Sequence, residues 1–396
     1  MKIVDLRART VAIPLSAQLR HNTGVHPGYF VRTILELVTD EGVVGLGEVG
    51  GGDQQLALLR LKPRILGLDP FHLEVIKRKV LRSIYYISNA RLYGAIEMAC
   101  LDIQGKVLGR PISDLLGGRV RDRIPMIAYL FWRYDRPGGG DDQRAEDLAD
   151  FCEELHGTLG IKAMKLKAGV MDPDEEARVL ELCRERLGPR FGLRIDPNGV
   201  WSVPTAVRIG RRLESIGLEY YEDPAWGLEG NAAVRRQVRI PIATNMYPNR
   251  FDDLGPAVRM GAVDIILADL HYWEGPRGVK DLVAVCRTFQ LGVAMHSGSE
   301  FGVELAAMLH TAATIPEMTF AVDAHYHYLT DDIIAGGPFR YEDGCIRVPT
   351  GPGLGVELDE EKMRYYQQFY EEKGDYYARF HQDPRRPEWY PMIGAW

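Results

Sequence analysis

The sequence has little of what marks secreted, membrane-bound or nucleic-acid-binding proteins. It holds five cysteines in 396 residues, an odd number with no paired spacing, so we expect them to be reduced and buried in a cytoplasmic protein. No apolar run approaches the length of a membrane span, and the chain begins with an alternating strand pattern, so we expect neither an export signal nor a membrane anchor. The net charge is −7 and no basic stripe is present, which argues against nucleic-acid binding. A small anionic substrate is still compatible, because a local basic site can outweigh an acidic whole.

The predicted strands and helices follow two different patterns, which divide the chain into two parts. Hydrophobic residues make up 46% of it, which is enough for one large domain and a smaller one. Residues 1–125 show three strands followed by helices, which is typical of an α+β unit. The stretch 20–28 is long and polar for a connection between two strands, which predicts a mobile or functional loop. The predicted strands are 3–12, 30–39 and 43–47, and the predicted helices are 56–66, 71–83 and 89–108.

Strands and helices alternate from residue 126 to residue 336. Eight strands in such an alternation predict a (β/α)8 barrel of the TIM type. A doubly wound sheet is the alternative, but no Gly-rich phosphate turn follows any strand. Residues 337–396 are irregular, and we expect them to pack back on the first domain. The eight predicted strands are 126–130, 163–167, 193–196, 218–222, 240–244, 264–268, 292–296 and 319–323.

Three successive strand ends carry side chains with oxygen atoms. Asp196, Glu222 and Asn245 each follow a short apolar stretch, and side chains at the ends of barrel strands converge at one mouth. Three hard oxygen ligands suit Mg²⁺ better than zinc. Any one of these residues alone could be a helix cap or a solvated loop residue. Three of them in register with the barrel period favour a metal site.

Groups able to transfer protons flank this predicted metal site. Lys165 and Lys167 lie two apart on one strand, so both ammonium groups should enter the mouth, where crowding beside a divalent ion would let one lose its proton near neutral pH. Asp269 and His296 end neighbouring strands, and the carboxylate would fix the tautomer of the imidazole. The alternatives are an exposed basic pair and a structural histidine. His325, after the last predicted strand, is a weaker candidate.

This combination suits removal of a proton alpha to a carboxylate. The metal and Lys165 would absorb the charge that develops on the carboxylate. Bases on two sides could serve both stereochemistries at that carbon. If the next carbon carries a hydroxyl, a protonated His296 could assist its departure, which gives dehydration in place of racemisation.

The motifs resemble the enolase superfamily and, within it, the glucarate dehydratase subgroup. Asn245 is informative, since this subgroup resembles the present chain in using an amide as third metal ligand where other branches use an acid. The similarity covers most of the chain. It includes Gly24-Val-His26, Gly45-Leu-Gly47-Glu48, Lys165-Leu-Lys167-Ala-Gly169, Ile195-Asp196-Pro-Asn198, Glu222-Asp-Pro224, Ala243-Thr-Asn245-Met246, Ala268-Asp269, His296-Ser297 and Val322-Asp323-Ala-His325.

The resemblance implies a Mg²⁺-dependent dehydratase of six-carbon diacid sugars such as D-glucarate or L-idarate, with a 5-keto-4-deoxy-glucarate product, and a first domain that closes over the barrel mouth. It implies that Lys167 and His296 are opposed bases, with His296 also the acid that expels the hydroxyl. Lys165 and Asn198 would contact the enolate oxygens. The residues expected to hold the rest of the substrate are Asn22, His26, Tyr129, Ser297, His325 and Arg379.

Two of the positions that depart from the subgroup pattern leave the identity of the substrate open. Gly298 stands where the family has an amide side chain, and Gly94 stands where a threonine is expected. Loss of such polar contacts shifts substrate preference by about 10-fold or more. The alternatives are therefore a dehydratase or epimerase of another acid sugar, and a non-catalytic paralogue that binds a partner enzyme. Barrel enzymes of this type are commonly symmetric, so a homo-oligomer is expected.

Overall fold

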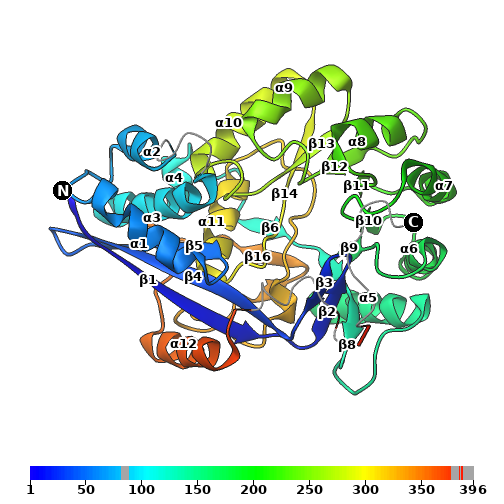
Figure 1. Cartoon of the computed structure of the whole chain (residues 1–396), viewed down its shortest axis with the longest axis horizontal. Helices are drawn as coiled ribbons and strands as arrows, with labels where there is room; N and C mark the ends of the chain where they lie inside the picture. Colours follow the sequence, from blue (N-terminus) through cyan, green and yellow to red (C-terminus); the bar gives the residue numbers. More distant parts are fainter. Residues whose placement is uncertain (82–88, 376–382, 384, 387–396) are drawn as a thin grey trace.

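An antiparallel sheet of three strands begins the fold. The computed structural model describes residues 1–81, 89–375, 383, 385 and 386. The strands pair in the order β1-β4-β5, and α3 is buried along most of its length because it lies between this sheet and α10 (Figure 1). The elements of this part are β1 (Ile3–Pro14), β4 (Tyr29–Thr39), β5 (Val44–Gly50), α1 (Gln54–Ile65), α2 (Leu73–Leu81), α3 (Ala90–Leu108) and α4 (Ile112–Leu115).

The stretch 20–28, which the sequence predicts to be a mobile or functional loop, lies in a short hairpin. Strands β2 (Gln18–His21) and β3 (Gly24–His26) pair with each other, and β2 also pairs with β8 (Trp132–Tyr134). A local pattern could not show this, because β8 lies far along the chain. The pairing holds the hairpin against the second part of the molecule (Figure 1).

Seven parallel strands form the main sheet, in the order β14-β13-β12-β11-β10-β9-β7. The eighth predicted strand, 319–323, does not form. Single bridges join Met318 to Val293 of β14 and Val322 to Met126, so this segment links the two edges of the sheet without a continuous ladder. The strands are β7 (Ala128–Leu130), β9 (Ala163–Lys167), β10 (Gly192–Asp196), β11 (Tyr220–Glu222), β12 (Ile242–Thr244), β13 (Ile265–Ala268) and β14 (Gly292–Met295).

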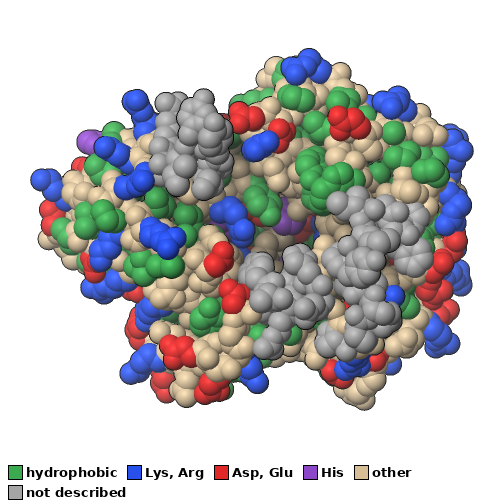
Figure 2. Space-filling view, viewed as in Figure 1, with side chains coloured by type: hydrophobic (Ala, Val, Ile, Leu, Met, Phe, Trp, Pro, Cys, Tyr) green, Lys and Arg blue, Asp and Glu red, His purple; other side chains and the backbone are tan. Residues whose placement is uncertain are grey.

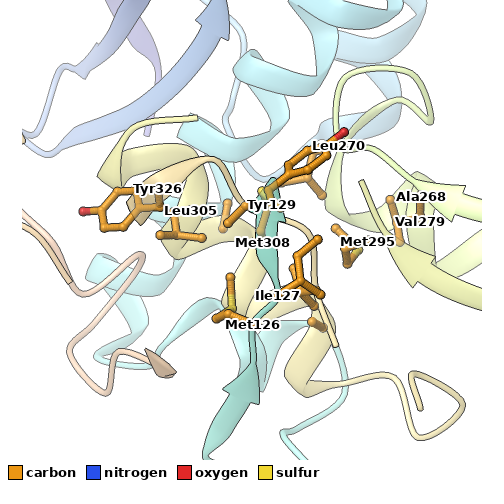
Figure 3. Packing of buried hydrophobic residues seen from close by; sticks show 14 of the residues in the cluster. Met126, Ile127, Tyr129, Ala268, Leu270, Val279, Met295, Leu305, Met308 and Tyr326 are labelled. Atoms are coloured by element: carbon orange, nitrogen blue, oxygen red, sulfur yellow. The ribbon is translucent and has the colours of Figure 1, made fainter. Parts of the chain in front are cut away.

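Helices cover the outside of this sheet, as a TIM-like barrel requires (Figure 1). Buried apolar side chains fill the space between strands and helices, and Figure 3 shows Met126 and Ile127 beside Met295 of β14 and Met308 of α11. The outer helices are α5 (Ala145–Leu159), α6 (Pro173–Leu187), α7 (Val203–Leu213), the short η1 (Glu214–Ile216), α8 (Gly227–Arg235), α9 (Phe251–Met260), α10 (Gly275–Thr288) and α11 (Gly302–Ala313).

The described part of the C-terminal segment contacts the first part of the chain. After η2 (Tyr326–Tyr328), strands β15 (Tyr341–Glu342) and β16 (Cys345–Arg347) pair with β6 (Arg123–Pro125) in the order β15-β16-β6. Helix α12 (Glu360–Lys373) packs against β1. The domain boundaries at 125 and 336 stay predictions.

The cysteines agree with most of what the composition suggested. All five cysteines are free, and four are buried, whereas Cys345 on β16 is partly exposed. Across the described ranges, no helix combines the length and the apolar character that a bilayer crossing needs.

Gly94 has a packing role that the sequence did not reveal. A Cβ atom at this position would lie 2.6 Å from the carbonyl oxygen of Leu270, because α3 crosses the loop after β13 there. Gly94 does not line the cavity described below. The residue therefore allows a close approach of helix and loop, and is not a missing substrate ligand.

We expect Gly94→Ala to lower the free energy of unfolding by about 1–3 kcal/mol, since the added methyl meets fixed backbone. Gly157→Ala in α5 is the matched control, because no atom lies within 4 Å of its added Cβ. That change should instead raise stability by up to about 1 kcal/mol through helix propensity. Urea unfolding of the two variants would test this, and equal effects would show that α3 can shift to accept the methyl group.

Candidate active site

A cavity of about 590 Å³ opens between the first part of the chain and the barrel. Figure 2 shows this hollow near the centre of the face, with a histidine side chain inside it. Lys165, Asp196 and Glu222 do not line the cavity, and Arg379 lies outside the described residues. The predicted site residues that line it are Asn22, His26, Tyr129, Lys167, Asn198, Asn245, Asp269, His296, Ser297 and His325.

Asp196, Glu222 and Asn245 lie at the ends of β10, β11 and β12, and all three are buried. Parallel pairing places these ends side by side. Among the described residues, Oε1 of Glu222 and Oδ1 of Asn245 have no hydrogen-bond partner. Burial and the nearby charge of Asp196 raise the pKa of Glu222 well above its ordinary value. Two buried oxygens without partners beside crowded carboxylates fit a divalent cation that prefers oxygen ligands.

Asp223 is close to the same carboxylates but has a different role. Three carboxylate oxygens, one from each of Asp196, Glu222 and Asp223, lie within 4.8 Å of one another. However, Asp223 accepts hydrogen bonds from the Thr244 hydroxyl at 2.6 Å and from the Asn245 backbone N–H at 3.1 Å. These hydrogen bonds tie Asp223 to the end of β12, so Asp223 positions Asn245 beside the metal site.

The two lysines of β9 differ in position. Lys165 is fully buried, and its Nζ pairs with Glu222 at 2.5 Å and with Asp323. Only Lys167 reaches the cavity, where its Nζ lies 2.6 Å from Asp196. The prediction that both ammonium groups enter the mouth is therefore wrong for Lys165, because two acids beneath the cavity hold it.

The carboxylates also decide the charge of these lysines. Burial is the largest single effect on Lys167 and would lower its pKa, but the charges of Asp196, Tyr129 and Glu222 together outweigh burial and raise it. Asp323 and Glu222 raise the pKa of Lys165 in the same way against burial. The attraction of Lys167 to these acids is larger than its repulsion by the ammonium group of Lys165.

His296 and Asp269 form the expected pair. Nδ1 of His296 lies 2.9 Å from Oδ2 of Asp269, and the other oxygen of Asp269 accepts the backbone N–H of His271 at 2.7 Å. Although burial alone would raise it, hydrogen bonds from His271 and His296 hold the pKa of Asp269 well below its ordinary range. An ionised Asp269 accepts the Nδ1 proton of His296 and leaves Nε2 for the cavity.

A buried charge network behind this pair was missed by the sequence reasoning. Nδ1 of His271 lies 2.9 Å from Glu304 Oε1, and Nε2 of His271 lies 2.8 Å from the carbonyl oxygen of Glu48. Arg32 pairs with Glu48 at 2.7 Å and also with Glu304. The ligand atoms of Asp269, His271 and Glu304 lie close enough together that they could hold a metal ion. The guanidinium of Arg32 already supplies the cation there.

The remaining predicted residues surround the other side of the cavity. Nδ2 of Asn22 donates to the carbonyl oxygen of Pro197 at 3.4 Å, so the β2–β3 hairpin contacts the loop after β10. The His26 ring is buried, and burial together with the charge of Lys167 lowers its pKa to about 3. Asn198 has a positive φ of 49°, which the tight turn after β10 requires. Ser297 and His325 contact each other at 2.6 Å.

A barrel whose strand ends combine an oxygen-lined cation site with separate proton-transfer groups defines a class of metal-assisted enzymes. The chain belongs to the enolase superfamily: residues 3–117 match the mandelate racemase / muconate lactonizing enzyme N-terminal domain, and residues 147–362 match the enolase C-terminal domain-like family. This membership accounts for the TIM-like barrel and for the strand-rich domain at its mouth.

Several relatives cover nearly the whole chain. A probable glucarate dehydratase of Streptomyces coelicolor is 35% identical, over 96% of this chain and 95% of its own length. A chloromuconate cycloisomerase of Cupriavidus pinatubonensis is 29% identical, over 92% and 99%. The crystal structure of an enolase from Thermobispora bispora, complexed with magnesium and formate, superposes with a TM-score of 0.93 at 37% identity and covers 100% of both chains. These relatives are named for different reactions, so membership of the superfamily does not by itself say which reaction this chain catalyses.

Proposed function

We propose that the protein is a Mg²⁺-dependent dehydratase of an acid sugar, with a hexarate such as D-glucarate or L-idarate as substrate and 5-keto-4-deoxy-glucarate as product. The observation that carries this proposal is the order of the strands. The three strands of the metal site, β10 to β12, lie between β9 with Lys167 and the pair β13 and β14 with Asp269 and His296. A carboxylate held at the metal site would thus have a candidate base on each side.

The residues would divide the reaction as follows. Asp196, Glu222 and Asn245 would hold Mg²⁺, which when bound supplies positive charge to the substrate carboxylate as its alpha carbon loses a proton. His296 Nε2 takes that proton on one side. On the other side Lys167 Nζ takes it in its neutral form, which a metal ion held by Asp196 would favour by compensating the charge of that carboxylate. The electron pair of the C–H bond then forms a carbon–carbon double bond. Protonated His296 donates a proton to the beta hydroxyl, whose C–O bond breaks to release water. The enol product then becomes the ketone.

Lys165 has a different role here from the one that the resemblance implied. It is fully buried and paired with Glu222 and Asp323, so we assign it to neutralising these acids and not to touching the enolate oxygens. Asn198 lines the cavity and stays a candidate for that contact.

A second candidate is the dehydration or epimerisation of a different acid sugar. Gly298 lines the cavity, and a Cβ built there would lie 3.6 Å from Asp269 Oδ2 and 3.9 Å from Arg32 Nη1, which are ordinary contacts. The position therefore has room that a side chain could fill, and a bulkier or more polar substrate group could occupy it. A homo-oligomeric state and a cytoplasmic location also stay predictions.

A panel of hexarates and shorter sugar acids, incubated with the protein and Mg²⁺ in D₂O, tests the proposal. We expect a keto product from glucarate or idarate and loss of turnover when EDTA removes the metal, restored by added Mg²⁺. Turnover of another acid alone would select the second candidate. If neither product nor deuterium uptake occurs with any acid, the proposal fails and the non-catalytic alternative gains support.

A further inference from the structure

Ser297, Glu300 and His325 form a buried chain of hydrogen bonds at one wall of the cavity. The Ser297 hydroxyl donates to Glu300 Oε2 at 2.6 Å and lies 2.6 Å from Nδ1 of His325. The backbone N–H of His325 also donates to the same hydroxyl oxygen at 3.2 Å. Glu300 is fully buried, and Ser297 and His325 are 2% and 6% exposed. No part of the reaction described above uses Glu300.

The Ser297 hydroxyl can satisfy these three contacts in one way when Glu300 is ionised. A hydroxyl has one proton to donate and two lone pairs that accept. The proton goes to the carboxylate of Glu300, which can only accept. One lone pair takes the backbone N–H of His325, so the other must take a proton from Nδ1 of the His325 ring.

We propose that Glu300, acting through Ser297, fixes His325 as the Nδ1–H tautomer, so that its Nε2 presents a hydrogen-bond acceptor to a ligand in the cavity. Ser297 is then fully used within this chain of hydrogen bonds. Its role is to transmit the effect of Glu300, in contrast to the direct substrate contact that the resemblance implied. Glu300 is a positioning residue in this scheme.

The charge states in the structure agree with this geometry. Burial lowers the pKa of His325 well below its ordinary value, so the ring is neutral and carries a single proton. Burial raises the pKa of Glu300 to about 7. The other charged or titratable groups that act on Glu300 are Arg32, Glu48 and Tyr341. Above this pH range Glu300 is ionised and can only accept.

The fixed tautomer narrows the substrate class, and this step rests on the proposed function. A neutral imidazole that presents a lone pair accepts from a hydroxyl, but it offers no proton to a carboxylate. His325 would therefore contact a hydroxyl of the sugar chain and not its distal carboxylate. An acid that lacks this hydroxyl would leave Nε2 without a partner, at a cost of about 10-fold or more in specificity.

NMR of ¹⁵N-histidine-labelled protein tests the tautomer directly, without any substrate. The His325 signals are assigned by their absence from a His325→Gln spectrum, and couplings to the ring protons show which nitrogen carries the proton. At a pH above the titration of Glu300, we expect the wild type to be protonated at Nδ1. A proton on Nε2 in the wild type would overturn the proposal, whatever the variants do.

Glu300→Leu and Glu300→Gln separate the acceptor from the charge. In Glu300→Leu the Ser297 hydroxyl has no carboxylate to donate to, so it should donate to Nδ1 of His325 and move the ring proton to Nε2. In Glu300→Gln the amide oxygen still accepts, so the proton should stay on Nδ1. A Glu300→Leu spectrum that keeps the proton on Nδ1 contradicts the proposal.

Enzyme kinetics then test separately whether His325 contacts a hydroxyl of the substrate. With an acid that the wild type dehydrates, Glu300→Leu should raise KM about 10-fold with little change in kcat, and Glu300→Gln should resemble the wild type. If no acid in the panel is turned over, the proposed function fails, while the NMR result still decides the role of Glu300.

Discussion

Asp269→Asn is expected to lower kcat by about 10³- to 10⁴-fold while the fold stays intact. Oδ1 of Asp269 accepts the backbone N–H groups of His271 at 2.7 Å and Tyr272 at 3.3 Å. The oxygen of an asparagine must therefore occupy the same place, which turns its NH₂ group toward His296. That NH₂ would donate to Nδ1 and move the ring proton to Nε2, so His296 would face the cavity as a donor and could not take a proton.

The effect should depend on which side of the substrate loses its proton. Deuterium exchange of substrates epimeric at the alpha carbon would measure the two sides separately. We expect exchange on the His296 side to be lost and exchange on the Lys167 side to persist. Asp264→Asn is a matched control, because Asp264 stands just before the other end of β13 and pairs with Arg235 at the surface. An equal loss on both sides would point to general damage and not to the tautomer of His296.

The parts of the site that could be predicted are those that repeat with the barrel. Asp196, Glu222 and Asn245 follow apolar stretches at a regular interval, so convergence of strand ends was enough to bring them together. Alternation along a strand gave Lys165 and Lys167 the same face, but it could not show which acids lie beneath. The eighth strand was predicted from its apolar pattern, whereas the structure joins 318–322 to its neighbours by single bridges only.

The parts that could not be predicted depend on contacts between distant segments. The 20–28 stretch is polar when taken alone, and the structure places it in a hairpin whose first strand, β2, pairs with the distant β8. Gly94 matched a family position for a polar contact, but its place is set by the carbonyl oxygen of Leu270. Glu300 lies three residues after Ser297, and only the fold shows that His325 completes the chain of hydrogen bonds.

Glu48 makes the most consequential of these distant contacts. It stands on β5, yet its Oε1 accepts the backbone N–H of Phe301 at 2.7 Å and its Oε2 accepts that of Glu304 at 2.9 Å. Phe301 and Glu304 begin α11, so a carboxylate from the first part of the chain caps the N-terminus of a barrel helix. The same carboxylate pairs with the buried Arg32.

Glu48→Ala should lower the free energy of unfolding by about 3–5 kcal/mol, because it leaves Arg32 short of a partner in a buried place and removes the cap of α11. Glu36→Ala on the neighbouring strand β4 is the control, since Glu36 pairs with the partly exposed Arg9 and should cost about 1 kcal/mol or less. Urea unfolding of both proteins would measure the difference. If the two costs are equal, the first part of the chain is held on the barrel mainly by other contacts, such as the β2–β8 pairing. A much larger loss of unfolding free energy in Glu48→Ala than in Glu36→Ala would mean that this one carboxylate holds the first part of the chain on the barrel. Because it does so next to the contact between His271 and Asp269, the packing of the two parts would then also help to place His296.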